Sequence, residues 1–274
     1  MGIEDRRRMR ARYDDQGERE WERLQKDPQN RVAYEIHRRF LNRFIKNGDH
    51  VLEVGAGPGR YTFDLANLGA TVEVTDFSPV QLELHRQHLN GTTAENAVAS
   101  RTLLDICDTS KYSDATFDAV LAYGGPLSYA FEEAEDALNG LFRVTKSGGA
   151  VVASVMSTLG SWRFFFPGVV HDTKTVGRVA NERAFTTGDL RHFQTEHVCQ
   201  MFRSREIVNL VERCGAELLA MSASNWSSLN DEEVLLELET HPDDWALFLD
   251  QEEAACAEPG AVDGGTHLLF AARR

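Results

Sequence analysis

The sequence has few cysteines, an excess of negative charge and no long apolar run. Its four cysteines are widely separated and form no Cys-x-x-Cys pair, so the pattern favours neither a zinc site nor a disulfide framework. We therefore expect free thiols and no metal site. The formal net charge of −14 disfavours bulk nucleic acid as a partner, because affinity for DNA or RNA depends on Lys and Arg.

Apolar runs long enough for a membrane are missing as well. No segment approaches the ~18 apolar residues needed to cross a bilayer, and no early apolar stretch resembles a signal peptide. We expect no membrane partner and a cytoplasmic location. Positive charge is concentrated only in residues 6–12, where neighbouring acidic residues favour a solvated helix face over an RNA-contacting arm.

Short β-branched or apolar runs alternate with segments of helical spacing along most of the chain. The runs predict strands at residues 50–54, 70–75, 98–104, 117–122, 149–156, 216–221 and 266–271. The spacing predicts helices at residues 61–68, 79–89, 132–144, 204–214 and 231–257. Regular alternation of this kind is typical of an α/β fold with a doubly wound, mostly parallel sheet, here of seven strands.

Two segments depart from the alternation and are expected to be additions to the core. Residues 1–46 are polar and helix-favouring, which predicts two or three helices that form an N-terminal lid. Residues 157–201 interrupt the pattern after the fifth strand, and we expect an insertion that caps the substrate. The remainder of 47–274 then forms the main domain.

A glycine-rich turn, Gly55-Ala-Gly57-Pro-Gly59, follows the first predicted strand. Such a turn lets the backbone approach a ligand and directs amide N–H groups at it. A dinucleotide-binding turn would have its third glycine at position 60, where this chain has Arg60, so the spacing disfavours NAD. Asp76 and Asp105 follow the next two strands, at the sheet edge where α/β proteins bind ligands. Read separately, each could be a helix cap or a solvated turn residue.

The ordered set of Gly55-x-Gly57-x-Gly59, Asp76, Asp105-Ile106 and Tyr123-Gly-Gly resembles the class I S-adenosylmethionine-dependent methyltransferases of the small-molecule type. The resemblance implies a Rossmann-like methyltransferase fold and S-adenosylmethionine as cofactor. It also implies that the glycines admit the methionine part of the cofactor and that Asp76 holds the ribose.

The same resemblance implies roles for further residues around the cofactor. Glu53 and Arg60 would border its amino-acid end, while Phe77 and Ile106 would pack on the adenosine. Asp105 would accept from the adenine amino group, and Tyr13 could cap the cofactor from the N-terminal helices. The full expected cofactor set is Tyr13, Glu53, Gly55, Ala56, Gly57, Gly59, Arg60, Asp76, Phe77, Ser78, Asp105, Ile106 and Tyr123.

No catalytic residue is assigned by the sequence, because in-line methyl transfer needs mainly alignment and exclusion of water. A hydroxyl or ammonium acceptor would still profit from a base. The candidates are His171, His192 and His197 in the insertion, and Tyr129 after the fourth strand. For each histidine, a surface or structural imidazole is the competing interpretation.

The loop after the fourth strand bears on the acceptor. Enzymes that methylate exocyclic base nitrogens or glutamine amides usually carry Asn/Asp-Pro-Pro-Tyr there, whereas this chain has Tyr123-Gly-Gly-Pro. With the acidic charge and the aromatic stretch 162–166, this favours methylation of O, N or C of a small organic molecule. The alternatives are a protein or RNA methyltransferase, a non-catalytic cofactor-binding module and, more distantly, a nicotinamide oxidoreductase. Both a monomer and a homodimer remain open.

Overall fold

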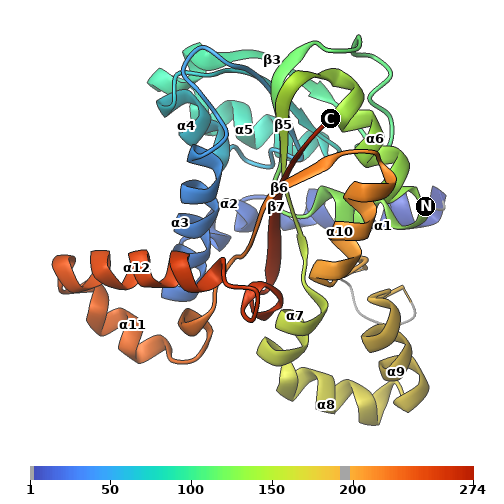
Figure 1. Ribbon diagram of the computed structural model, residues 1–274, viewed down its shortest axis with the longest axis vertical. Coiled ribbons are helices and arrows are strands. Elements are labelled where there is room, and N and C mark those ends of the chain that lie inside the picture. Colours follow the sequence, from blue (N-terminus) through green and yellow to red (C-terminus); the bar gives the residue numbers. More distant parts are fainter. Residues whose placement is uncertain (1–2, 192–197) are drawn as a thin grey trace.

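A central sheet with helices on both faces forms the core of the computed structural model, which describes residues 3–191 and 198–274 (Figure 1). Its strands are β1 (His50–Val54), β2 (Thr71–Asp76), β3 (Val98–Leu103), β4 (Phe117–Ala122), β5 (Thr145–Met156), β6 (Glu217–Ala223) and β7 (His267–Arg273). They are ordered β3-β2-β1-β4-β5-β7-β6, and β7 runs antiparallel to both of its neighbours. The expected seven-stranded, mostly parallel sheet is confirmed.

Both faces of the sheet are covered, so the central strands are apolar in almost every position. Adjacent residues of β1 point to opposite faces: Leu52 packs in one apolar cluster and Val51 in the other. β5 begins four residues earlier than expected, because Thr145 already pairs with Phe117 before a register shift. The carboxyl ends of the parallel strands therefore meet at one edge of a rigid sheet.

The helices that connect these strands are α4 (Arg60–Asn67), α5 (Pro79–Leu89), α6 (Ala134–Val144) and α10 (Ser204–Arg213). Short 3₁₀ turns occur at η1 (Thr93–Ala97), η2 (Pro126–Tyr129), η3 (Phe131–Glu133), η4 (Ser227–Leu229) and η5 (Val262–Gly264). α5 begins where expected, because Pro79 suits a first helical position and the Ser78 hydroxyl caps the helix by accepting from the Gln81 amide, 3.1 Å away.

Three helices precede the sheet: α1 (Ile3–Gln16), α2 (Arg19–Arg23) and α3 (Pro28–Asn42). α3 is amphipathic and buries Val32, Ile36 and Leu41. α1 is very different, since Met9 is its one buried hydrophobic residue among those described. α1 must therefore be held in place largely by polar contacts.

The structure alters two of the helical expectations. The insertion after β5 is present, but it is largely helical, with α7 (Thr158–Phe164), α8 (Phe166–Thr175) and α9 (Arg178–Thr187). The single helical region expected at 231–257 is two helices, α11 (Glu232–Glu239) and α12 (Pro242–Cys256). Proline lacks an amide hydrogen and disfavours helical geometry in the preceding residue, so Pro242 divides the region. None of the helices described is long and apolar enough to cross a bilayer.

Candidate cofactor and acceptor site

A pocket lies at the carboxyl ends of β1, β2 and β4, and its empty space, including the part open to solvent, is about 740 Å³. The strand order reverses between β1 and β4, which is where α/β sheets bind ligands. The expected cofactor residues that line it are Tyr13, Gly55, Gly57, Asp76, Phe77, Asp105, Ile106 and Tyr123. Those outside its lining are Glu53, Ala56, Gly59, Arg60 and Ser78.

The glycine turn is shaped by close packing as well as by its backbone angles. Gly55 has φ +73°, and a Cβ atom there would come within 2.6 Å of Pro126 Cγ. Gly59 has φ +102°, and a Cβ atom there would lie 2.8 Å from Leu89 and 2.9 Å from His85. Side chains are excluded at both positions, because the loop after β4 and helix α5 press against the turn.

Asp76 ends β2 and is 8% exposed at the pocket wall. Its Oδ2 accepts from the Gly57 amide and its Oδ1 from the Ser78 amide, both at 2.8 Å. Burial raises the pKa of Asp76 to about 6, and the two amide donors oppose that rise. A carboxylate offers about four acceptor positions, so Asp76 can still accept from a ligand.

Asp105 provides a second carboxylate, between the apolar residues Leu104 and Ile106 of the lining. Its Oδ1 accepts from the Cys107 amide at 3.0 Å. Its Oδ2 lies 3.0 Å from Arg6 Nε, which belongs to α1. The pocket therefore combines two separate carboxylates with an apolar wall, and one of them is tied to the N-terminal helix.

Hydrogen bonds hold α1 against the pocket. The Tyr13 and Tyr129 hydroxyl oxygens are 2.5 Å apart, Ser78 Oγ donates to Asp14 Oδ1 at 2.5 Å, and Gln81 Nε2 donates to the Tyr13 carbonyl at 2.9 Å. Burial raises the pKa of both tyrosines above its ordinary value. Both phenols are therefore neutral at physiological pH and act as hydrogen-bonding groups.

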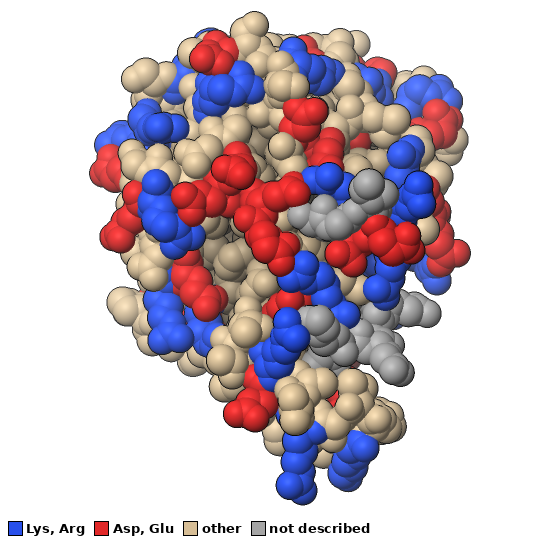
Figure 2. Space-filling model, turned by 90° about the vertical axis from the view of Figure 1, so that its right-hand side faces the viewer, with Lys and Arg blue, Asp and Glu red and all other residues tan. Residues whose placement is uncertain are grey.

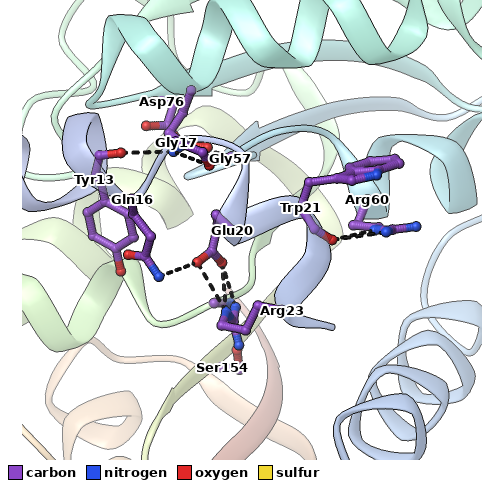
Figure 3. Close-up of polar contacts among 12 residues, drawn as sticks. Tyr13, Gln16, Gly17, Glu20, Trp21, Arg23, Gly57, Arg60, Asp76 and Ser154 are labelled. Carbon is purple, nitrogen blue, oxygen red and sulfur yellow. Dashed lines mark hydrogen bonds and ion pairs between the residues drawn. The ribbon is translucent and has the colours of Figure 1, made fainter. Parts of the chain in front are cut away.

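Helix α2 adds a charged residue to the lining that no sequence pattern indicated (Figure 3). Glu20 accepts from Gln16 Nε2 at 2.9 Å and pairs with Arg23 at 2.6 Å. Its Cγ lies 4.0 Å from where a Cβ of Gly57 would stand, so it borders the glycine turn.

Arg60 is engaged elsewhere. Its guanidinium lies 3.5 Å above the Trp21 ring and donates to the Trp21 carbonyl at 2.9 and 3.1 Å. Figure 3 shows this pair apart from the group formed by Tyr13, Gln16 and Glu20. Arg60 therefore fastens α2 to the start of α4 and does not reach the pocket lining.

Glu53 lies behind the turn, at the end of a buried hydrogen-bonded chain. Arg101 Nε donates to His85 Nδ1 at 2.9 Å, so the neutral imidazole carries its proton on Nε2. That nitrogen is 2.8 Å from Thr62 Oγ1, which donates to Glu53 Oε2 at 2.6 Å. Burial lowers the pKa of His85 to about 3 and raises that of Glu53 to about 8. This series of hydrogen bonds stabilises the elements that flank the glycine turn.

Of the possible catalytic residues, Tyr129 lines the pocket. His171 is exposed on α8 and is not part of the lining, and His192 and His197 lie outside the described residues. Residues 3–191 and 198–274 contain no group of His, Cys, Asp and Glu arranged to hold a metal ion. Lining residues that the sequence reasoning missed include Met9, Glu20, Gln81 and Leu104.

Comparison with known proteins identifies the core. Residues 51–149 match the family model of the methyltransferase domain. The ribosomal protein L11 methyltransferase of an Exiguobacterium species is 30% identical over 117 residues, 42% of this chain and 34% of the relative. The demethylmenaquinone methyltransferase of Clavibacter sepedonicus is 34% identical over 111 residues, 40% of this chain and 42% of the relative. The chain thus spans less than half the length of the curated relatives it matches.

Solved structures agree in fold at low sequence identity. The complex of the Haloferax volcanii Trm112 methyltransferase activator with a candidate methyltransferase gives a TM-score of 0.62 at 16% identity, over 96% of both chains. The geranyl diphosphate C-methyltransferase of Streptomyces coelicolor gives 0.53 at 14% identity, over 86% of this chain and 77% of that one. Residues 51–149 are thus a methyltransferase domain within the seven-stranded sheet, and S-adenosylmethionine is the cofactor that such a domain implies.

Proposed function

We propose that this protein transfers a methyl group from S-adenosylmethionine to O, N or C of a small organic acceptor. The observation that carries the proposal is the pocket at the switch point, in which two carboxylates flank an apolar wall. An adenosine is complementary to this arrangement: its ribose hydroxyls and its amino group can each donate to a carboxylate, and its ring face can pack on the apolar wall. The two acceptor carboxylates and the apolar wall therefore fit the cofactor that the family implies.

In this proposal Asp76 accepts from the ribose hydroxyls with its remaining acceptor positions. Phe77 and Ile106 cover the two sides of the adenine, and Asp105 accepts from its amino group. Gly55 and Gly57 let the methionine part lie against the backbone of the turn, with Glu20 beside it. Glu53 supports the turn without contacting the cofactor.

When bound, S-adenosylmethionine supplies an electrophilic methyl group on a sulfonium sulfur. The residues of this chain must align the acceptor and exclude water. We assign α1 the role of a lid within the N-terminal segment 1–46, because its Met9 and Tyr13 line the pocket and its polar contacts tie it to Tyr129 and to the start of α5. Tyr13 and Tyr129 then orient the acceptor by hydrogen bonding, since their raised pKa values keep both phenols protonated and unsuited to act as bases.

A small acceptor is favoured because the side of the pocket next to Tyr129 is covered by α1 and the loop after β4. We extend this proposal to the insertion 157–201 as a cap, through its residues Cys199 and Met201, which pack in one apolar cluster with Tyr129; its helices α7, α8 and α9 take no part in the pocket lining. A protein acceptor is the second candidate, since one relative is named for ribosomal protein L11. The net charge of −14 offers little attraction for RNA.

Titration calorimetry with S-adenosylmethionine, S-adenosylhomocysteine and NAD tests the cofactor. We expect the two sulfur compounds to bind and NAD not to bind; the reverse result would reject the proposal. Transfer of a labelled methyl group is then measured with a metabolite extract, a ribosomal protein fraction and an RNA fraction. Label in small molecules supports the proposal, label in protein or RNA selects the alternative acceptor, and binding without any S-adenosylhomocysteine formed indicates a non-catalytic module.

A further inference from the structure

The helices of the insertion project from the lower end of the molecule and cover little of it (Figure 1). We call α7, α8 and α9 the arm. α8 contains no buried residue, and Ala184 is the one buried residue of α9. Isolated helices of about ten residues are marginal in water, and helices in proteins are stabilised mostly by burying an apolar face. The arm therefore needs a covering surface.

Large apolar side chains of the arm are exposed together. Trp162 lies 5.1 Å from Phe166 and 5.6 Å from Phe185 between ring centroids, yet these three side chains are 38%, 47% and 39% exposed. Phe165 and Val179 are more exposed still, at 57% and 81%. Contiguous apolar surface of this kind marks an interaction site.

The arm is also basic, in contrast to the rest of the molecule. Residues 158–187 hold four Lys and Arg against two Asp and Glu, on a chain with net charge −14. Lys174, Arg178 and Arg183 are exposed, and none forms an ion pair within the described ranges. In Figure 2 the protruding lower end is mostly uncharged with Lys and Arg at its tip, whereas acidic side chains form a band above it.

A second projecting element has the opposite charge. We call α11 and α12 the acidic hairpin; residues 231–258 hold eleven Asp and Glu, and no Lys or Arg occurs anywhere from 214 to 272. Its apolar residues Val234, Leu236 and Leu247 are 50%, 46% and 57% exposed. The exposed acidic residues without an ion pair in the described structure are Asp231, Glu232, Glu233, Glu237, Asp243, Asp244 and Glu258.

We propose that the arm of one copy of this chain packs on the acidic hairpin of a second copy, forming a two-fold symmetric homodimer. The two surfaces have opposite charge, both expose apolar side chains, and both project from the lower half of the molecule (Figure 1). Two-fold symmetry forms the contact twice and closes the assembly. Doubling the contact also helps to reach the roughly 1,200 Å² that stable interfaces bury.

A lipid surface is the competing occupant, because basic helices with exposed aromatic residues bind anionic membranes. The acidic hairpin argues against it. An anionic bilayer that attracted the arm would repel the hairpin, which projects from the same half of the molecule. A second copy satisfies both surfaces at once.

The oligomeric state of the full chain tests the proposal. Light scattering after gel filtration should give twice the 30.7 kDa of one chain. The dimer should weaken at least tenfold between about 0.05 M and about 0.5 M NaCl, since exposed charges are screened by salt. A monomer at ~100 µM in low salt overturns the proposal, because opposite charges should associate most strongly there.

Charge exchange tests the pairing. Arg178→Glu with Arg183→Glu, and separately Glu233→Arg with Glu237→Arg, should each weaken the dimer at least tenfold, since each places like charges across the contact. Combining all four changes in one chain restores opposite charges and should return the dimer to within about threefold of wild type. Lys111→Glu, an exposed charge reversal outside both surfaces, is the matched control.

Two results would overturn the pairing of the arm with the acidic hairpin. One is a dimer that neither double variant weakens, or that the combined variant does not restore. The other is a monomer that floats with vesicles of phosphatidylcholine and phosphatidylglycerol but not with phosphatidylcholine alone, which would assign the arm to a lipid surface. Unchanged cofactor binding by calorimetry verifies that each variant is folded.

Discussion

Replacing Asp76 with alanine is the most direct test of the cofactor site. At pH 7.5 this carboxylate is largely ionised, because its pKa of about 6 lies below that pH. Its oxygens accept from the Gly57 and Ser78 amides, and the residue lines the pocket. The substitution therefore removes the ribose acceptor and two internal hydrogen bonds together.

The magnitude follows from these contacts. Two ribose hydrogen bonds to a charged acceptor contribute ~2 to 4 kcal/mol in total when allowance is made for water that replaces the ligand in the free protein. That corresponds to a Kd for S-adenosylmethionine raised roughly 30- to 700-fold. The two amides left without partners should separately lower the free energy of unfolding by ~1 to 3 kcal/mol each if they stay buried.

Calorimetry and urea unfolding separate these two effects, with Asp64→Ala as the control. Asp64 is also 8% exposed and accepts from the Tyr34 hydroxyl at 2.7 Å, but it is not part of the pocket lining. The control should lose stability and keep its cofactor affinity within about threefold, because it breaks a hydrogen bond remote from the ligand. If Asp76→Ala binds S-adenosylmethionine as tightly as wild type, the ribose assignment is wrong.

Three further predictions concern the lid and the turn. Tyr13→Phe and Tyr129→Phe should each lower kcat/KM about tenfold on the acceptor found by screening. The double variant should have the same kcat/KM as the less active single variant, since both substitutions remove the same hydrogen bond. Because burial raises the pKa of Glu53 to about 8, the folded state holds a proton that the unfolded chain has lost, so stability should fall as pH rises from about 6 to 8. Glu53→Gln should remove that part of the slope in urea unfolding at a series of pH values; an unchanged slope contradicts the buried, protonated carboxyl. Arg60→Ala should lower stability by about 1 kcal/mol through the lost contact with Trp21 while S-adenosylmethionine affinity stays within threefold. A tenfold loss of affinity would return Arg60 to the cofactor site.

The site residues at the strand ends were predictable, because short sequence patterns mark where each strand ends and the strand ends lie at the ligand-binding edge of the sheet. β-branched runs locate β1 and β2, and Ser78-Pro79 marks the start of α5, so the position of Asp76 between them follows from neighbours in sequence. Asp105 follows the next strand in the same way. The division at Pro242 was also readable, since proline separates helices, but the long helical spacing of 231–257 obscured it.

Contacts between side chains that lie far apart in the sequence were not predictable in this way. Arg60 turns to Trp21, 39 positions earlier, and Glu53 bonds to Thr62, which is itself fixed by His85. Such partners are set by packing between α2, α4 and α5, and no short motif records that packing. For the same reason Glu20 carried no signal, because its place beside Gly57 depends on how α2 lies over the turn.

The proposed cofactor side and the proposed acceptor side of the site consequently differ in how strongly the core of the fold constrains their residues. The proposed cofactor residues sit at strand ends, where a substitution such as Asp76→Ala disturbs a position held by the buried sheet. The proposed acceptor side is formed by α1, whose described residues bury only Met9 among hydrophobic side chains and whose hold on the core is polar. Net hydrogen bonds contribute about 1 kcal/mol each, so α1 can change sequence or open without disrupting the core. Acceptor choice can therefore diverge within this fold while the cofactor turn remains recognisable.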